Sequence, residues 1–250
     1  MGIFSAWPKK RALDTVQVSD QQWLEAEALL PFLKHLDGYD RLRLRDLARE
    51  FLAGKEWSGA RGLALTPEIQ LSIALQACLL ILNLGIDHYR GWLGIVVYPG
   101  DFVIPRNVMD EDGVVHEYDD PVLGEAWEGG PVLISWFDDP NDADGVNVVI
   151  HEFAHKLDMA GGNVDGVPRL PAEMRRQDWI AAFEPAYLDF CARVDAGEET
   201  LLDPYGAEHP AEFFAVMSEA FFETPELLRD EYPAAYEQLR RFYRQDPAAT

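Results

Sequence analysis

The residues best suited to chemistry lie in one short segment, where two histidines and a glutamate form the pattern HExxH. His151 and His155 are one helical turn apart, so on a helix both imidazoles project from the same face and can bind one metal ion. Glu152 lies beside them, where its carboxylate can accept a proton from a water whose pKa the metal lowers to ~7. Neutral imidazoles suit zinc, so the motif predicts a zinc site with Glu152 as general base. The alternative is a pair of core histidines satisfied by hydrogen bonds.

A catalytic zinc normally takes three protein ligands and a water, so a third ligand is expected elsewhere. The extended pattern HExxHxxGxxH does not occur, because positions 158 and 161 are Asp and Gly. Asp165, in the glycine-rich segment that follows, is one candidate. Glu212 and Glu219 are better ones, because they share one face of an otherwise apolar predicted helix, where an unpaired carboxylate is costly. We expect Glu212 to be the ligand. Three roles stay open for Glu219. It is the second candidate for the third ligand, it orients an imidazole N–H, or it is a solvated or salt-bridged side chain.

A further carboxylate is placed to orient a histidine. Asp158 follows His155 by about one helical turn, so it can accept a hydrogen bond from that imidazole. An ion pair between Asp158 and Lys156 is less favourable, because residues two apart on a helix point to different sides.

The helices that must position these residues are predicted from hydrophobic periodicity and capping residues. Residues 146–159 are expected to form a largely buried helix that carries the motif, with Asp144 as its N-cap. Ser19 and Gln22 form a capping box at the start of the first helix. Thr66 and Pro67 mark the start of the third helix. The other expected helices cover 19–33, 39–52, 67–84, 175–194, 211–222 and 225–243, the last broken or kinked at Pro233.

Strands are expected only in the middle of the chain, so the order of elements predicts an α+β fold. An N-terminal extension (1–18) precedes a single domain (19–250), in which a helical N-terminal subdomain (19–88) leads into the catalytic core (89–250). The expected strands are 92–98, 102–104 and 132–137, with an acidic hairpin loop or surface insertion at 110–130.

Composition excludes several classes of protein. The 250 residues include 44 acidic and 21 basic side chains, a net charge of −23, which disfavours direct binding to nucleic acid or to an anionic membrane surface. The longest apolar stretch, 71–86, is too short and too often interrupted for a membrane span. The basic residues near the N-terminus precede no apolar run, which argues against a signal peptide. Cys78 and Cys191 lie in apolar-periodic stretches and are expected to be free thiols, so a cytoplasmic protein is predicted.

Four longer motifs are specific when they occur together: HEFAHKLD at 151–158, PAEFFAVMSEAFF at 210–222, FYRQDP at 242–247 and GPVLISW at 130–136. Through these motifs the chain resembles the Mlc titration factor A family of bacterial zinc peptidases. The resemblance covers roughly residues 20–247.

The resemblance implies a gluzincin with a zincin-like core, made of a small sheet and the HExxH helix and similar to the catalytic core of anthrax lethal factor. It implies one Zn²⁺ per chain held by His151, His155 and Glu212, with Glu152 as the general base. The family has a tyrosine seven residues before the ligand glutamate, and Tyr205 matches it. A phenol there can stabilise an oxyanion, and an ordinary half-buried loop tyrosine is the alternative.

His209 is not part of the family pattern, and we expect it to be a polar neighbour of the site and no ligand.

Members of this family act as aminopeptidases on short substrates and bind the glucose-responsive repressor Mlc. The resemblance therefore implies peptide hydrolysis and a second role in binding a repressor of the Mlc type. The alternative is a non-catalytic protein that sequesters the repressor and has a structural zinc site. Glu152 favours the enzyme, because a structural site needs no general base. The strongly acidic composition is compatible with a basic partner surface.

Overall fold

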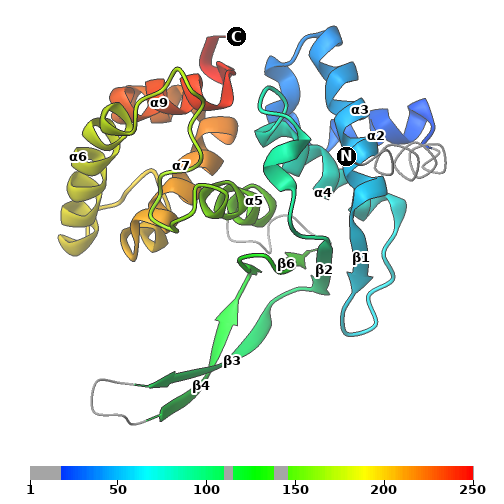
Figure 1. Ribbon diagram of the computed structural model, residues 1–250, viewed down its shortest axis with the longest axis horizontal. Coiled ribbons are helices and arrows are strands. Elements are labelled where there is room, and N and C mark those ends of the chain that lie inside the picture. Colours follow the sequence, from blue (N-terminus) through cyan, green and yellow to red (C-terminus); the bar gives the residue numbers. More distant parts are fainter. Residues whose placement is uncertain (1–17, 110–114, 138–145, 250) are drawn as a thin grey trace, which may run out of the picture.

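A computed structural model of the protein describes residues 18–109, 115–137 and 146–249. It has the mixed α+β architecture that was predicted. Figure 1 shows helices gathered on one side of a small sheet, and a two-stranded ribbon that projects from the other side. The α-helices are α2 (Asp20–Ala28), α3 (Gly38–Gly54), α4 (Pro67–Leu80), α5 (Val148–Met159), α6 (Arg176–Asp195), α7 (Pro210–Glu223), α8 (Pro225–Glu231) and α9 (Pro233–Tyr243). Short 3₁₀ helices are η1 (Pro31–His35), η2 (Ile86–Tyr89), η4 (Pro204–Ala207) and η5 (Pro247–Ala249). The strands are β1 (Glu56–Gly59), β2 (Gly94–Pro99), β3 (Phe102–Met109), β4 (Val115–Val122), β5 (Gly124–Ala126) and β6 (Val132–Trp136).

The N-terminal helices begin where their capping residues predict. Ser19 and Gln22 form the reciprocal capping box at α2, and the Thr66 hydroxyl accepts a hydrogen bond at the start of α4. Both helices end earlier than predicted. Helix α2 stops before Pro31, which lacks an N–H and opens η1, and α4 gives way after Leu80 to tighter turns. The predicted extension at 1–18 lies outside the described residues except for residue 18, and the predicted division at residue 88 stays a prediction.

The sheet has the strand order β1-β2-β6-β5 within the described residues. Strands β1, β2 and β6 run parallel, and β5 pairs antiparallel with β6 at the edge. Strands β2 and β6 lie close to the predicted positions. Strand β1 was not predicted, because its four residues are mostly exposed and lack the apolar alternation that marks a strand.

Strands β3 and β4 form the projecting ribbon, with a register from Phe102 opposite Val122 to Met109 opposite Val115. The prediction of an acidic hairpin loop or surface insertion over 110–130 is therefore confirmed in part, since β4 belongs to the projecting hairpin, whereas β5 pairs in the main sheet. These two strands were not predicted because the segment is acidic and lacks the apolar alternation of a strand. They form because β3 and β6 supply partners for their backbone hydrogen bonds. Residues 110–114 lie outside the described residues.

Helix α5, which carries the HExxH motif, lies at the centre of the molecule between α4 and α7 and against the sheet (Figure 1). All of its residues except Met159 are buried. Its N-cap is Asn147, whose side-chain oxygen accepts the N–H of Ile150 at 3.0 Å. Asp144, the predicted N-cap, lies outside the described residues. The motif therefore belongs to the core, as its apolar neighbours predicted.

The C-terminal helices pack as a group beyond α5 (Figure 1). The predicted break at Pro233 is confirmed, since α8 ends at Glu231 and Pro233 opens α9. Among the described residues no helix is long and apolar enough to span a membrane. Cys78 is buried, Cys191 is partly buried, and both are free thiols.

Candidate metal centre

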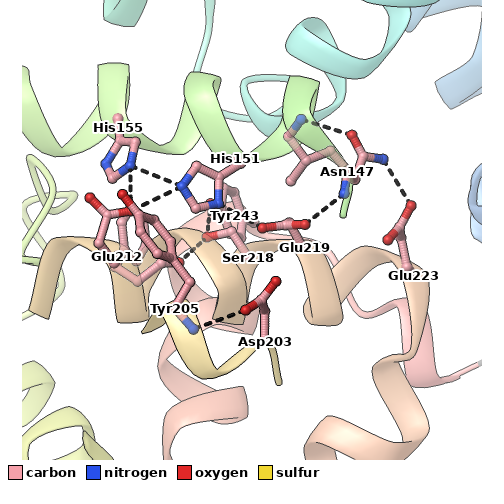
Figure 2. A network of polar contacts seen from close by, with 12 residues as sticks. Asn147, His151, His155, Asp203, Tyr205, Glu212, Ser218, Glu219, Glu223 and Tyr243 are labelled. Atoms are coloured by element: carbon pink, nitrogen blue, oxygen red, sulfur yellow. Dashed lines mark hydrogen bonds and ion pairs between the residues drawn. The ribbon is translucent and has the colours of Figure 1, made fainter. Parts of the chain in front are cut away.

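Three side chains from two adjacent helices meet at one point. His151 and His155 project from the same face of α5, and their Nε2 atoms are 3.1 Å apart. Glu212, in the first turn of α7, places Oε2 3.0 Å from the His151 Nε2 and 3.1 Å from the His155 Nε2 (Figure 2). The structure thus brings together the three residues that were predicted to hold the metal.

The donor atoms fit a divalent metal such as zinc. Glu219 Oε1 lies 2.7 Å from the His151 Nδ1, and because a carboxylate only accepts, Nδ1 carries the proton and Nε2 keeps its lone pair. Two imidazole nitrogens and a carboxylate oxygen that face one another repel unless a cation lies among them. In a tetrahedral zinc site with bonds of about 2.0–2.1 Å, neighbouring ligand atoms lie about 3.3 Å apart. The observed spacings are close to that value.

The electrostatics of this group also favour a bound cation. Burial alone lowers the pKa of His151, but the carboxylates of Glu212 and Glu219 outweigh it, so the pKa of the ring is raised. Burial alone raises the pKa of Glu212, and the two imidazoles reverse this, so its pKa is lowered. The two carboxylates thus stabilise positive charge at the His151 ring, and the imidazoles stabilise negative charge at Glu212.

Glu219 and Asn147 hold His151 in place from behind. Glu219 is buried on α7, and its second oxygen accepts the backbone N–H of Asn147 at 2.7 Å. Asn147 also donates its side-chain N–H to Glu223 at 2.8 Å (Figure 2). Of the readings open for Glu219, the structure supports the one in which it orients an imidazole N–H. Asn147 was missed, although its position as a helix N-cap just before the motif offered a signal.

Glu152 lies on a different face of α5, beside the three convergent side chains. Its side chain is buried, lines the same cavity, and its Oε2 has no hydrogen-bond partner among the described residues. Burial raises its pKa to about 7, an effect that His151 and His155 partly offset. A carboxyl with this pKa, next to a metal-binding cluster, suits proton transfer near neutral pH.

Tyr205 and His209 lie next to the cluster on the segment that leads into α7. The Tyr205 ring centroid lies 6.2 Å from that of His151, and 48% of the residue is exposed (Figure 2). His209 is the N-cap of α7, and its Nδ1 accepts the N–H of Ala211 at 3.2 Å. His209 is not among the three convergent residues, and its role stays a prediction.

Asp158 and Asp165 lie apart from the cluster. Asp158 is fully buried, and its Oδ2 accepts the N–H of Gly166 at 2.9 Å. The described contacts of Asp158 include no hydrogen bond to His155, so the expected orienting role is not supported. Asp165 forms an ion pair with Arg176 at 2.7 Å.

A cavity of about 700 Å³ opens over the cluster. Its lining includes strand β5 at the edge of the sheet and the residues Asp203, Tyr205 and Glu208. Gly124 of β5 lies so close to Glu152 that a Cβ there would be 2.4 Å from its Oε1. Nothing in the local sequence indicated this contact, because it joins segments far apart in the chain.

Comparison with known proteins places these features in a family. The chain matches the family described as "Glucose-regulated metallo-peptidase M90" over residues 4–244. It is 38% identical over 248 residues to "Mlc titration factor A" of Klebsiella pneumoniae, which covers 97% of this chain and 92% of that protein. It is 39% identical over 234 residues to "Mlc titration factor A" of Yersinia pestis, with 91% and 86% covered.

Proposed function

The chain belongs to the glucose-regulated metallopeptidase family M90, and on this premise we propose that it is a zinc-dependent peptidase of the gluzincin type with a zincin-like core. One observation carries the proposal. The Nε2 atoms of His151 and His155 and the Oε2 of Glu212 meet at 3.0–3.1 Å, with the buried carboxyl of Glu152 beside them. A metal-binding triad with an adjacent proton acceptor is the minimum that metal-assisted hydrolysis requires.

In this proposal His151, His155 and Glu212 hold one Zn²⁺ per chain. Zinc bound there supplies a Lewis acid that polarises the scissile carbonyl and lowers the pKa of water to about 7. Glu152 accepts a proton from the attacking water and delivers it to the leaving amine, because its buried carboxyl lies beside the ligand cluster and lines the same cavity. Glu219 keeps the His151 ring in the tautomer whose Nε2 faces the ligand cluster.

The walls of the cavity support a peptide substrate with a free amino end. Strand β5 has no strand paired to its outer side within the described part of the sheet, so its backbone can pair with an extended peptide. The described residues that line the cavity include Asp203 and Glu208 and no lysine or arginine, which suits a cationic α-amino group. Tyr205 would donate its phenol O–H to the oxyanion. We therefore propose an aminopeptidase-like activity.

The test is hydrolysis of a panel of aminoacyl-nitroanilides by the zinc-loaded wild type and by Glu152→Gln. The substitution keeps the metal ligands and the side-chain shape, so kcat should fall about 100-fold or more while zinc binding persists. Asp165→Asn is the matched control, because it removes a carboxylate whose ion pair with Arg176 lies outside the cluster. Equal activity of wild type and Glu152→Gln would refute the assigned base.

A second role, binding a repressor of the Mlc type, is favoured by the name shared by the relatives in Klebsiella and Yersinia. The net charge of −23 suits a partner with a basic surface. Binding of a purified Mlc-type repressor should be equal for wild type and Glu152→Gln, because recognition does not need the general base. Binding by both proteins with turnover by neither would favour the alternative of a non-catalytic, repressor-sequestering protein with a structural zinc site.

A further inference from the structure

Helix α5 presents a second functional face, one turn long, toward strand β5. Glu152 and Lys156 are four residues apart and so share this face, whereas the two histidines face α7. Lys156 is only 3% exposed, which is rare for a lysine. Its ammonium donates to the backbone oxygens of Trp127 at 2.5 Å and Gly130 at 2.9 Å, in the turn between β5 and β6.

Two contacts therefore dock β5 on α5, one at each end of the strand. At the C-terminal end of β5, Lys156 contacts the turn at 127–130. A hydrogen bond from the Gly130 N–H to the Trp127 oxygen, at 3.0 Å, closes this turn. At the N-terminal end of β5, Gly124 lies against Glu152, and a Cβ at this glycine would lie 2.4–2.7 Å from the carboxyl group and Cγ of Glu152. The Oε2 of Glu152 has no hydrogen-bond partner among the described residues, and β5 packs directly against this carboxyl at Gly124.

We propose that Lys156 and Gly124 are positioning residues for Glu152. Lys156 fixes the distance of β5 from α5, and Gly124 leaves the space that the Glu152 carboxyl occupies. The inference rests on the proposed function, in which Glu152 is the general base. Neither residue contacts the three convergent ligand atoms, so both act on proton transfer and leave metal binding unchanged.

The chain offers a matched comparison in Lys55. Its ammonium also donates to two backbone oxygens, those of Tyr89 at 2.8 Å and Trp92 at 2.9 Å. It also lies over the Trp92 ring, at 3.3 Å from the centroid, as Lys156 does at 4.8 Å. Lys55 thus makes the same kind of contact to a different backbone segment, while the Trp92 ring is shared by the two lysines.

The test compares Lys156→Met with Lys55→Met, which both remove an ammonium and keep an unbranched side chain. Amide hydrogen exchange, measured by mass spectrometry on the metal-free protein, should be about tenfold faster over 123–131 in Lys156→Met and unchanged over 86–93. Lys55→Met should give the reverse pattern. In the zinc-loaded proteins, kcat should fall about 10- to 100-fold in Lys156→Met with the zinc Kd and KM near wild type, whereas Lys55→Met should keep kcat.

Gly124→Ala is the second variant, since it displaces Glu152 directly and leaves the Lys156 contacts in place. Its kcat should fall to a similar degree with exchange over 127–131 unchanged. Any one of three results would overturn the proposal. These are unchanged exchange over 123–131 in Lys156→Met, equal losses of kcat in the two lysine variants, and full activity of Gly124→Ala. If Glu152→Gln retains wild-type activity, the proposed function fails. The exchange pattern still reports separately whether Lys156 holds β5.

Discussion

Replacing Glu219 by Gln tests whether the carboxylate behind His151 supports metal binding. Both oxygens of Glu219 are used, one by the His151 Nδ1 and one by the Asn147 N–H, each at 2.7 Å, and the side chain is buried. Gln has a single acceptor oxygen, so one of these donors loses its partner. Loss of a carboxylate that orients a ligand histidine typically costs 10- to 100-fold in metal affinity, which corresponds to about 1.4–2.7 kcal/mol.

The assay is a zinc titration of the metal-free protein against a competing chelator of known affinity. Glu223→Gln is the control, because Glu223 lies on the same helix and contacts only the Asn147 side chain of this network (Figure 2). Its zinc Kd should stay within about twofold of wild type, since it touches no candidate ligand. A wild-type Kd in Glu219→Gln would refute the assigned role, and equal losses in both variants would mean that the effect is not specific to His151.

Three further perturbations address the elements that frame the site. His209→Ala removes the acceptor for the Ala211 N–H, so urea unfolding of the metal-free protein should show a loss of about 1 kcal/mol. Gly166→Ala should cost about 2 kcal/mol or more in the same assay, because φ is +77° and the new Cβ would lie 2.4 Å from the Pro210 oxygen. Burial raises the pKa of Asp158 from 3.8 to about 6, although the Gly166 N–H opposes this shift. The folded state thus holds this proton more tightly than the unfolded chain. The resulting stabilisation is complete below about pH 4 and is lost by about pH 6, a change of about 3 kcal/mol. Asp158→Asn lacks this change, so parallel stability–pH curves for it and wild type would contradict the assignment.

The candidate site could be predicted from the sequence wherever its geometry is local. The spacing of His151 and His155 on one helix determines their convergence, and the apolar surroundings of Glu212 marked it as a buried carboxylate that needs a partner. Contacts across the fold could not be predicted in this way. Gly124 and Lys156 meet their partners only because β5 packs on α5, and no spacing along the chain encodes that distance.

The fold shows the same division between local and distant causes. Helix starts at Ser19 and Thr66 follow from capping by neighbouring side chains, so they were found. Strands β1, β4 and β5 are short or acidic and depend on partners elsewhere in the chain, so they were missed. The expected orienting role of Asp158 assumed that proximity along a helix implies contact, whereas its carboxylate bonds to the Gly166 N–H.

The β3–β4 ribbon has a consequence for how this protein can diversify. The two parallel strands β2 and β6 are neighbours, yet the chain between them leaves the sheet and returns beside its starting point, at the pair Phe102 and Val122 (Figure 1). Most such crossovers are helices whose length is dictated by the sheet they cover. Here the connecting segment pairs with itself as β3 and β4, so its length does not affect the register of the strands in the main sheet. A change in the length of the ribbon, or a recognition segment grafted onto it, should therefore leave the residues that line the cavity in place.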